Sequence, residues 1–161
     1  MTHRVRIERN TLRFAAAHFT TFDGECEPLH GHNYDVTVEF EGSLTSDSWV
    51  IDFSEAKALV RGLCKELDHK FLLPTKNAEL NASRSGGELE LKWGDRRYVM
   101  PEADVASLEI DNTTAERLAE WFAGRIVADL QARGAANVTG VTVGVEEMPG
   151  QAGWFTLSLG L

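Results

Sequence analysis

The sequence predicts an α+β protein in which a four-stranded antiparallel sheet carries two helices on one face. Apolar and polar side chains alternate along four segments, and apolar side chains recur every three or four positions along two others. Turn-forming residues separate these segments. The length of 161 residues suits one domain. We therefore expect a single domain over residues 1–161, with an inserted β-hairpin within an insertion at about residues 75–111.

The first two strands are predicted in the amino-terminal part of the chain. Residues 4–19 alternate apolar and charged side chains with a break around Asn10, so they predict a long or bulged strand that ends at His18. A polar loop follows over residues 20–29. Residues 34–41 alternate strictly, which is typical of a half-buried antiparallel strand.

The first helix is predicted after the short apolar segment 49–53. Apolar residues recur at three and four positions from Ala56 to Leu67, and either Asp52 or Ser54 can cap the start. Cys64 belongs to this apolar stripe. We expect it to be a small buried side chain and not a reactive thiol.

Residues 74–111 are the least regular part of the chain. The polar segment 77–87 predicts a flexible connection, and two alternating segments around Gly94-Asp95 predict a β-hairpin. No chemistry is required of this stretch, which we expect to cover a pocket or a sheet edge.

The second helix is predicted to begin at Thr113 and to stop at Gly134. Thr113 and Glu116 have the spacing of a capping box, and helix capping is the simpler explanation of both residues. Two strands follow, separated by Pro149-Gly150. Glu147 continues the apolar face of the first of them. A carboxylate there is costly unless it pairs with a donor such as the N–H groups of a ligand.

Three histidines indicate a metal site. His30 and His32 stand two apart at the mouth of the second strand, so their side chains point to the same face. His18 supplies a third imidazole, and three histidines with an open position are typical of catalytic zinc. Cys26 lies close by, either as a fourth ligand or as a thiol beside the metal. The alternative is that these histidines are hydrogen-bonded residues without a metal.

Asp68 and His69 directly follow the first predicted helix. A carboxylate that orients an imidazole can act as a proton relay. Solvated capping of the helix end is the simpler explanation of this pair.

Composition and charge limit the partners. The formal net charge of −9 argues against nucleic acid and anionic membranes, which bind basic surfaces. The amino terminus has no apolar segment long enough for a signal peptide or a membrane span, so we expect a cytoplasmic protein. Two cysteines do not form a disulfide framework. Uncovered edges of the predicted sheet favour a homo-oligomer.

Spaced motifs along the chain occur in an order found in one known family. They are F-x-A-A-H ending at His18, Cys26-x3-His30-Gly31-His32-Asn33-Tyr34, Trp49-Val50-Ile51-Asp52-Phe53, Leu67-Asp68-His69, Thr114-Ala115-Glu116 and Glu147-x-Pro149. Together they resemble the 6-pyruvoyltetrahydropterin and 6-carboxytetrahydropterin synthases, over nearly the whole chain outside the insertion. The three residues between Cys26 and His30 are similar to the bacterial 6-carboxytetrahydropterin branch.

The resemblance implies a tunnelling fold (T-fold), in which subunits close their sheets into a barrel. The barrels would stack as a hexamer, a dimer of trimers, with sites between subunits. It also implies a zinc-dependent lyase that converts 7,8-dihydroneopterin triphosphate to 6-carboxy-5,6,7,8-tetrahydropterin, a precursor of queuosine-type deazapurines. A pyruvoyl-type synthase or another pterin-converting enzyme would use the same site. A non-catalytic oligomer that binds zinc or a pterin is the alternative from another class.

The resemblance further implies roles for the metal and proton-transfer residues. Zn²⁺ would be held by His18, His30 and His32. Cys26 would act as the general base, with Asp68-His69 as a second proton-transfer group.

A third set of residues would hold the pterin. Glu147 would anchor its amino and ring N–H donors with a bidentate carboxylate, helped by Thr114 and Glu116. The chain departs from the family here: residues 112–117 replace the usual Pro-Thr-Ser/Ala-Glu-Asn, and Met148 replaces a usual threonine. These departures leave the substrate side chain and the product open.

Overall fold

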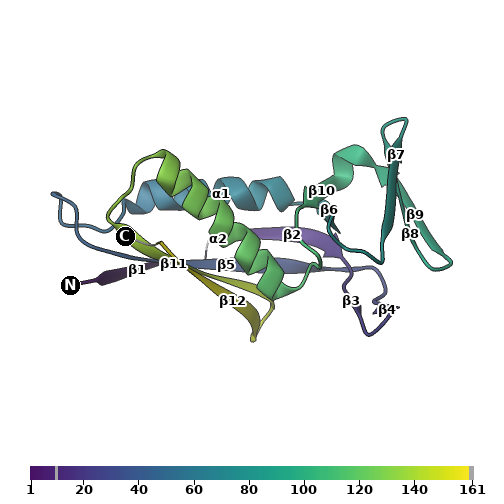
Figure 1. The fold of residues 1–161 in the computed structure, drawn as a ribbon, viewed down its shortest axis with the longest axis horizontal. Coiled ribbons are helices and arrows are strands. Elements are labelled where there is room, and N and C mark those ends of the chain that lie inside the picture. Colours follow the sequence, from purple (N-terminus) through teal and green to yellow (C-terminus); the bar gives the residue numbers. More distant parts are fainter. Residues whose placement is uncertain (10, 160–161) are drawn as a thin grey trace.

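The computed structural model describes residues 1–9 and 11–159. Two helices cover one face of a curled sheet, and a smaller sheet extends the molecule at one end (Figure 1). The helices are α1 (Phe53–Leu67) and α2 (Ala115–Ala132), with a 3-10 turn η1 (Glu102–Asp104). The strands are β1 (His3–Ile7), β2 (Arg13–His18), β3 (Thr21–Phe22), β4 (Glu25–Cys26), β5 (His30–Gly42), β6 (Lys70–Pro74), β7 (Asn81–Ser85), β8 (Glu88–Trp93), β9 (Arg96–Pro101), β10 (Val105–Leu108), β11 (Val138–Met148) and β12 (Gln151–Ser158).

The main sheet has seven strands in the order β10-β6-β2-β5-β11-β12, with β1 also beside β5. Strand β2 pairs with residues 30–35 of β5, and β1 pairs with residues 38–42. Since β11 takes the other edge of β5, β1 and β2 run one after the other along a single edge. This is the interrupted strand predicted for residues 4–19. The predicted break at Asn10 lies outside the described residues.

The sheet differs from the predicted four-stranded antiparallel one, because β6 pairs in parallel with both β2 and β10. Strand β6 follows directly on the end of α1, and its apolar residues 71–73 do not alternate with polar ones. Short apolar runs cannot be assigned to strand or helix from periodicity alone. The partner residues 16–17 are also remote in sequence. The sequence therefore contains no local signal for this parallel part of the sheet.

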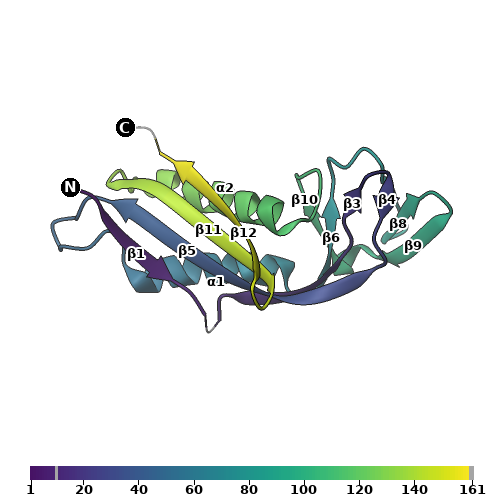
Figure 2. The ribbon, with the colours of Figure 1, turned by 90° about the horizontal axis from the view of Figure 1, so that it is seen from below.

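The core lies between the two helices and the sheet, and Figure 2 shows the opposite face of the sheet with both helices behind it. Each fully buried leucine, isoleucine, valine or phenylalanine side chain contributes about 2 kcal/mol to folding. The main contributors are Val60, Leu63 and Leu67 of α1, Leu118, Phe122 and Ile126 of α2, and Val36, Val38, Phe40, Val141 and Val143 of the sheet.

Helix α1 follows its predicted limits. Asp52 caps it, because its carboxylate accepts hydrogen bonds from the backbone N–H groups of Ser54 (2.7 Å) and Glu55 (3.1 Å). Cys64 is 2% exposed, and burial raises the pKa of its thiol to about 12. The prediction that Cys64 is a buried apolar side chain is confirmed.

Helix α2 begins at Ala115, two residues after the predicted start, and its cap lies one residue after the predicted cap. Thr114, and not Thr113, is the capping residue, and its hydroxyl accepts the backbone N–H of Arg117 at 3.3 Å. At the other end Gly134 has a φ of 71°, a left-handed conformation that favours glycine, and the predicted stop is confirmed.

Strands β7, β8 and β9 form a separate antiparallel sheet, which we call the insert sheet. The predicted hairpin β8–β9 is confirmed, but the segment predicted as flexible contains the third strand, β7. The sequence of β7 does not alternate apolar and polar residues, and all of its side chains are exposed. Backbone pairing with β8 therefore orders this strand. Buried residues of β8 join a second hydrophobic cluster, which we call the second core; it contains Phe19, Cys26, Phe71, Leu73, Leu89 and Leu91.

No helix in the described part of the chain is long and apolar enough to cross a membrane.

Candidate metal centre and adjoining pocket

Three histidines from β2 and β5 converge, as the sequence predicts. His18 pairs directly with His30 across the two strands, and His32 follows two residues along β5 on the same face. The ring centroids are 4.7 Å apart for His18 and His30, 5.2 Å for His18 and His32, and 4.9 Å for His30 and His32. One ligand nitrogen from each ring lies within 4.8 Å of the others, so the three residues could hold a metal ion.

Hydrogen bonds determine which nitrogens two of these rings present. Nδ1 of His18 lies 3.1 Å from the carbonyl oxygen of Thr113, and Nδ1 of His30 lies 2.8 Å from that of Pro28. A carbonyl oxygen only accepts, so each Nδ1 carries the proton and each Nε2 of the neutral ring keeps a lone pair. The two Nε2 atoms face each other at 3.2 Å. Two lone pairs at this distance repel unless a cation lies between them, and the donor set therefore fits a metal ion.

Burial keeps the His18 ring uncharged. Its side chain is 1% exposed, and burial together with the neighbouring His30 lowers its pKa to about 4. Near neutral pH the ring is therefore in the neutral form that binds metals.

A pocket of about 320 Å³ adjoins the histidines. Predicted site residues reach it from three parts of the chain: His18 and His30 from the sheet, Thr114 and Glu116 from the start of α2, and Glu147 from β11. The structure thus brings together two predicted metal ligands and all three predicted pterin-binding residues.

Thr113 is a site residue that the capping pattern concealed. It is fully buried, its hydroxyl donates to the carbonyl of Phe19 at 3.1 Å, and the same oxygen lies 3.2 Å from Nδ1 of His18. With its carbonyl on the same ring nitrogen, Thr113 orients His18. The sequence has no signal for this role, because the contact joins residues 95 positions apart.

Cys26 lies outside the pocket. Its side chain is 7% exposed and belongs to the second core, and Sγ donates to the carbonyl oxygen of Glu27 at 3.6 Å. Burial raises the pKa of this thiol, although Arg96 opposes the shift. The side chain predicted as the general base is therefore a buried thiol and not a lining group of the pocket.

Glu27, which the sequence analysis did not select, lines the pocket together with His18 and His30. Its carboxylate accepts the backbone N–H of Thr20 at 3.0 Å, and its own N–H donates to the carbonyl of Thr20 at 3.0 Å. Burial raises the pKa of Glu27, but the hydrogen bonds from Thr20 and the nearby His30 outweigh burial and hold the pKa below its ordinary value. The only sequence feature that could have indicated Glu27 as a pocket residue is its position next to Cys26. Adjacent residues of an extended segment point to opposite sides, so if one of the two is buried, the other can face the pocket.

Asp68 and His69 do not reach this pocket within one chain. The Asp68 carboxylate accepts the backbone N–H of Ala15 at 2.8 Å and pairs with Nδ1 of His69 at 2.9 Å. His69 is largely exposed and has a φ of 57°. It lines a different hollow, formed with Lys70, residues 15–17 of β2 and residues 31–33 of β5, so the third predicted metal ligand, His32, faces this hollow and not the pocket of His18 and His30.

The pocket is acidic. Among the described residues that line it, none is lysine or arginine, whereas Glu27, Glu116 and Glu147 contribute three carboxylates. A triphosphate needs cations, which this part of a single chain does not provide.

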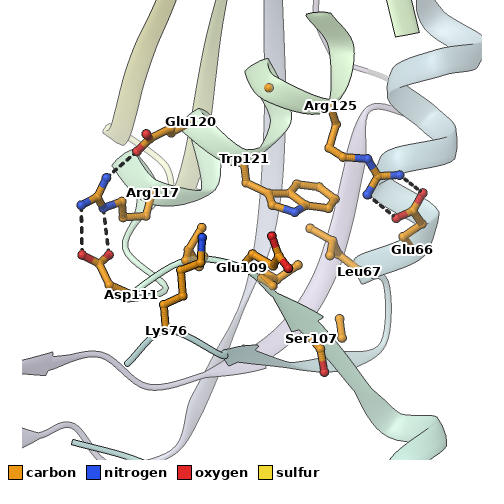
Figure 3. A pocket seen from close by; sticks show the side chains of 14 residues that line it. Glu66, Leu67, Lys76, Ser107, Glu109, Asp111, Arg117, Glu120, Trp121 and Arg125 are labelled. Carbon is orange, nitrogen blue, oxygen red and sulfur yellow. Dashed lines mark hydrogen bonds and ion pairs between the residues drawn. The ribbon is translucent and has the colours of Figure 1, made fainter. Parts of the chain in front are cut away.

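A larger hollow, of about 760 Å³, lies elsewhere, between the end of α1, the outer face of α2 and β10 (Figure 3). Its two arginines are already paired: Arg117 with Asp111 and Glu120, and Arg125 with both carboxylate oxygens of Glu66. Figure 3 shows the ion pairs of Arg117 on one side of the hollow and those of Arg125 on the other. It contains none of the predicted site residues.

The chain belongs to the 6-pyruvoyl tetrahydropterin synthase family, whose sequence profile matches residues 6–157. A Methanocaldococcus jannaschii protein with the provisional name 6-carboxy-5,6,7,8-tetrahydropterin synthase is 36% identical over 141 residues, 87% of this chain and 86% of that protein. The crystal structure of 6-pyruvoyl tetrahydropterin synthase from Plasmodium vivax has a TM-score of 0.93 at 29% identity and covers 99% of both chains. The family resemblance and the family fold are confirmed.

Two further similarities concern the chemistry of relatives. Other structures of the Plasmodium vivax protein carry a glutamate, described as a catalytic residue, replaced by alanine or by cysteine. A Pyrococcus furiosus protein named dihydroneopterin monophosphate aldolase is 42% identical over 59 residues, 37% of this chain and 50% of that protein.

Proposed function

We propose that this protein is a zinc-dependent lyase that converts 7,8-dihydroneopterin triphosphate to 6-carboxy-5,6,7,8-tetrahydropterin. The observation that carries the proposal is a single pocket lined by His18 and His30, by Glu147, and by the start of α2. Family membership and the name of the Methanocaldococcus jannaschii relative support the choice of a pterin. The product would serve as a precursor of queuosine-type deazapurines.

His18, His30 and His32 would hold the Zn²⁺. The facing Nε2 atoms of His18 and His30, and the uncharged ring of His18, match the nitrogen ligands of catalytic zinc. Bound zinc supplies a Lewis acid that makes neighbouring O–H and C–H bonds of the substrate side chain more acidic.

Glu147, Thr114 and Glu116 would orient the pterin ring. The Glu147 carboxylate accepts hydrogen bonds from the amino group and ring N–H of the pterin, which present two donors side by side. The binding energy holds the substrate side chain beside the histidines, so that proton transfer is intramolecular.

Glu27 is the group that we propose to move protons at the substrate side chain. Its carboxylate lines the pocket and is ionised at neutral pH because its pKa is low, as a general base requires. The catalytic glutamate of the Plasmodium vivax relative supports a carboxylate in this role. Cys26, the base that the resemblance implies, is the alternative.

Asp68 and His69 would serve the site of a neighbouring subunit. His69, which pairs with Asp68, lines a separate hollow of its own chain, and the pocket lacks cations for a triphosphate among its described lining residues. We therefore propose a homo-oligomer, a hexamer built as a dimer of trimers, in which adjacent subunits complete each site.

An aldolase is the second candidate function. The resemblance to the Pyrococcus furiosus aldolase and a carboxylate base both favour it. In this reaction the base removes a proton from a side-chain hydroxyl, and the bond between the first two side-chain carbons breaks. The carbon that stays on the pterin takes the electrons of the broken bond and a proton, and so becomes a hydroxymethyl group, while the second carbon leaves in a phosphorylated two-carbon aldehyde.

Product analysis tests the proposal. The protein reconstituted with Zn²⁺ is incubated with 7,8-dihydroneopterin triphosphate, and mass spectrometry identifies the pterin and the aldehyde. We expect 6-carboxytetrahydropterin, acetaldehyde and released triphosphate, with one zinc per chain. A hydroxymethyl pterin would identify the aldolase, a pyruvoyl pterin without carbon loss would identify the synthase, and bound zinc without turnover would leave a non-catalytic binding module.

A matched pair of histidine variants completes the experiment. His30→Ala should lose both zinc and turnover, whereas His3→Ala, on the outer strand β1, should keep both. Turnover that survives in His30→Ala would contradict a zinc-dependent reaction.

A further inference from the structure

The insert sheet reaches the segment that carries both candidate bases. Arg96 of β9 donates from Nη1 to the carbonyl of Glu27 at 3.0 Å and from Nη2 to the carbonyl of Cys26. One guanidinium therefore holds two consecutive carbonyl groups, and its five donors in a rigid plane suit such a double contact.

Arg96 is itself held in place by its own hairpin. Its guanidinium lies over the ring of Trp93, 4.8 Å from the centroid. Trp93 is the direct partner of Arg96 across the β8–β9 turn and packs against the second core. The contact with Trp93 thus orients the same guanidinium that holds the segment at residues 26–27.

The same sheet also holds the Cys26 side chain. Leu89 and Leu91 of β8 are fully buried and form the second core together with Cys26. Since successive side chains of an extended segment point to opposite sides, Glu27 is directed away from the second core. Its carboxylate meets the N–H of Thr20 at the pocket.

We propose that the insert sheet selects Glu27, and not Cys26, as the side chain presented to the metal centre, with Arg96 as the positioning residue. The inference rests on the proposed function, because it assigns the proton-transfer group of that reaction. The insertion, for which the sequence indicated no chemistry, thus determines which side chain of residues 26–27 faces the pocket.

Kinetics of Arg96→Ala test the proposal. Loss of the double contact frees the backbone at residues 26–27, and we expect kcat to fall by about ten- to a hundred-fold, as misplacement of a catalytic group does. KM should change little, because Glu147 on β11 anchors the pterin independently. In a Glu27→Gln background the same change should cause no further loss of kcat, since the group that Arg96 positions is already inactive.

Arg97→Ala is the matched control. Arg97 is the next residue of β9, and its side chain pairs with Glu90 inside the insert sheet at 2.6 Å. We expect kcat to stay at the wild-type value. If Arg96→Ala does not fold, Arg96→Lys replaces it, because lysine keeps a cation over Trp93 but cannot hold both carbonyls.

Thiol labelling gives a readout that needs no substrate and no metal. With 5,5′-dithiobis(2-nitrobenzoate), Cys26 should react at least about ten-fold faster in Arg96→Ala than in the wild-type protein, because burial now protects it. Cys64, buried in the main core, is the internal control and should keep its rate.

The outcomes separate this inference from the proposed function. A wild-type protein that converts no pterin overturns the proposed function, while the labelling rates still test the positioning. Unchanged kcat in Arg96→Ala, an equal loss in the Glu27→Gln background, or an unchanged Cys26 rate would each overturn the role of Arg96.

Discussion

Cys26 and Glu27 are neighbours in sequence and lie in different surroundings. The thiol is enclosed by the second core, where burial raises its pKa and makes the reactive thiolate less accessible. The carboxylate lies in the pocket of the histidines with its pKa held low. At the scale of single residues, the structure therefore places the Glu27 carboxylate, and not the Cys26 thiol, in the lining of this pocket.

Glu27→Gln and Cys26→Ala form a decisive pair. The amide cannot accept a proton, so we expect turnover to fall by about 10²- to 10⁴-fold in Glu27→Gln while zinc content stays unchanged. Cys26→Ala should keep most of the turnover and lose stability, by about 1–2 kcal/mol, because it removes a buried sulfur from the second core. Steady-state rates, metal analysis and urea unfolding measure these effects. The opposite pattern, loss of turnover only in Cys26→Ala, would restore the thiol as the base.

At the scale of elements, the start of α2 joins the metal centre to the pocket. Thr113 orients His18, and Thr114 and Glu116, which follow it, line the pocket. Gly153 of β12 makes this junction possible. A Cβ atom there would lie 2.4 Å from the backbone nitrogen of Glu116 and 2.5 Å from the carbonyl carbon of Ala115.

Gly153→Ala should therefore push the start of α2 away from β12. We expect a loss of about 1–3 kcal/mol in stability, as overpacking causes, and a raised KM for the pterin with unchanged zinc content. Gly124→Ala is the control, because Gly124 lies in the interior of α2 with nothing within 4 Å of the added Cβ. It should leave KM unchanged and stabilise the protein by about 0.5–1 kcal/mol. Equal behaviour of the two variants would show that the close contact is not required.

At the scale of the whole molecule, one chain provides only part of the proposed site. The sheet ends in β12 on one side and β10 on the other, and unpaired strand edges can pair with other chains. Asp68 and His69 lie outside the pocket that contains Glu27. In an oligomer, Asp68 and His69 of a neighbouring subunit can complete the pocket that contains Glu27.

Subunit mixing tests this division. Glu27→Gln and His69→Ala should each be nearly inactive, because each removes one proton-transfer group from every site. In mixed oligomers some sites combine an intact Glu27 with an intact His69 from the adjacent subunit, so activity should return after co-expression. Light scattering should give the mass of six chains. If both variants are inactive and the mixture stays inactive, or the protein is a monomer, the shared site is ruled out.

The helices, the long strands and the three histidines could be predicted because each depends on local spacing. The alternation of β5 placed His30 and His32 on one face, and the apolar stripes located α1 and α2 to within a few residues. The parallel strand β6 and the polar strand β7 could not be predicted, since remote backbone pairing orders them.

The sequence by itself determined the family and brought forward the three histidines and the predicted pterin-binding residues, because strand parity and motif order carry that information along the chain. Only the tertiary structure decided that Thr113 orients His18, that Cys26 is buried and that Glu27 faces the histidines. The physical reason is that these outcomes depend on contacts between segments far apart in sequence. Arg96, about 70 residues from the carbonyls that it holds, is the clearest case.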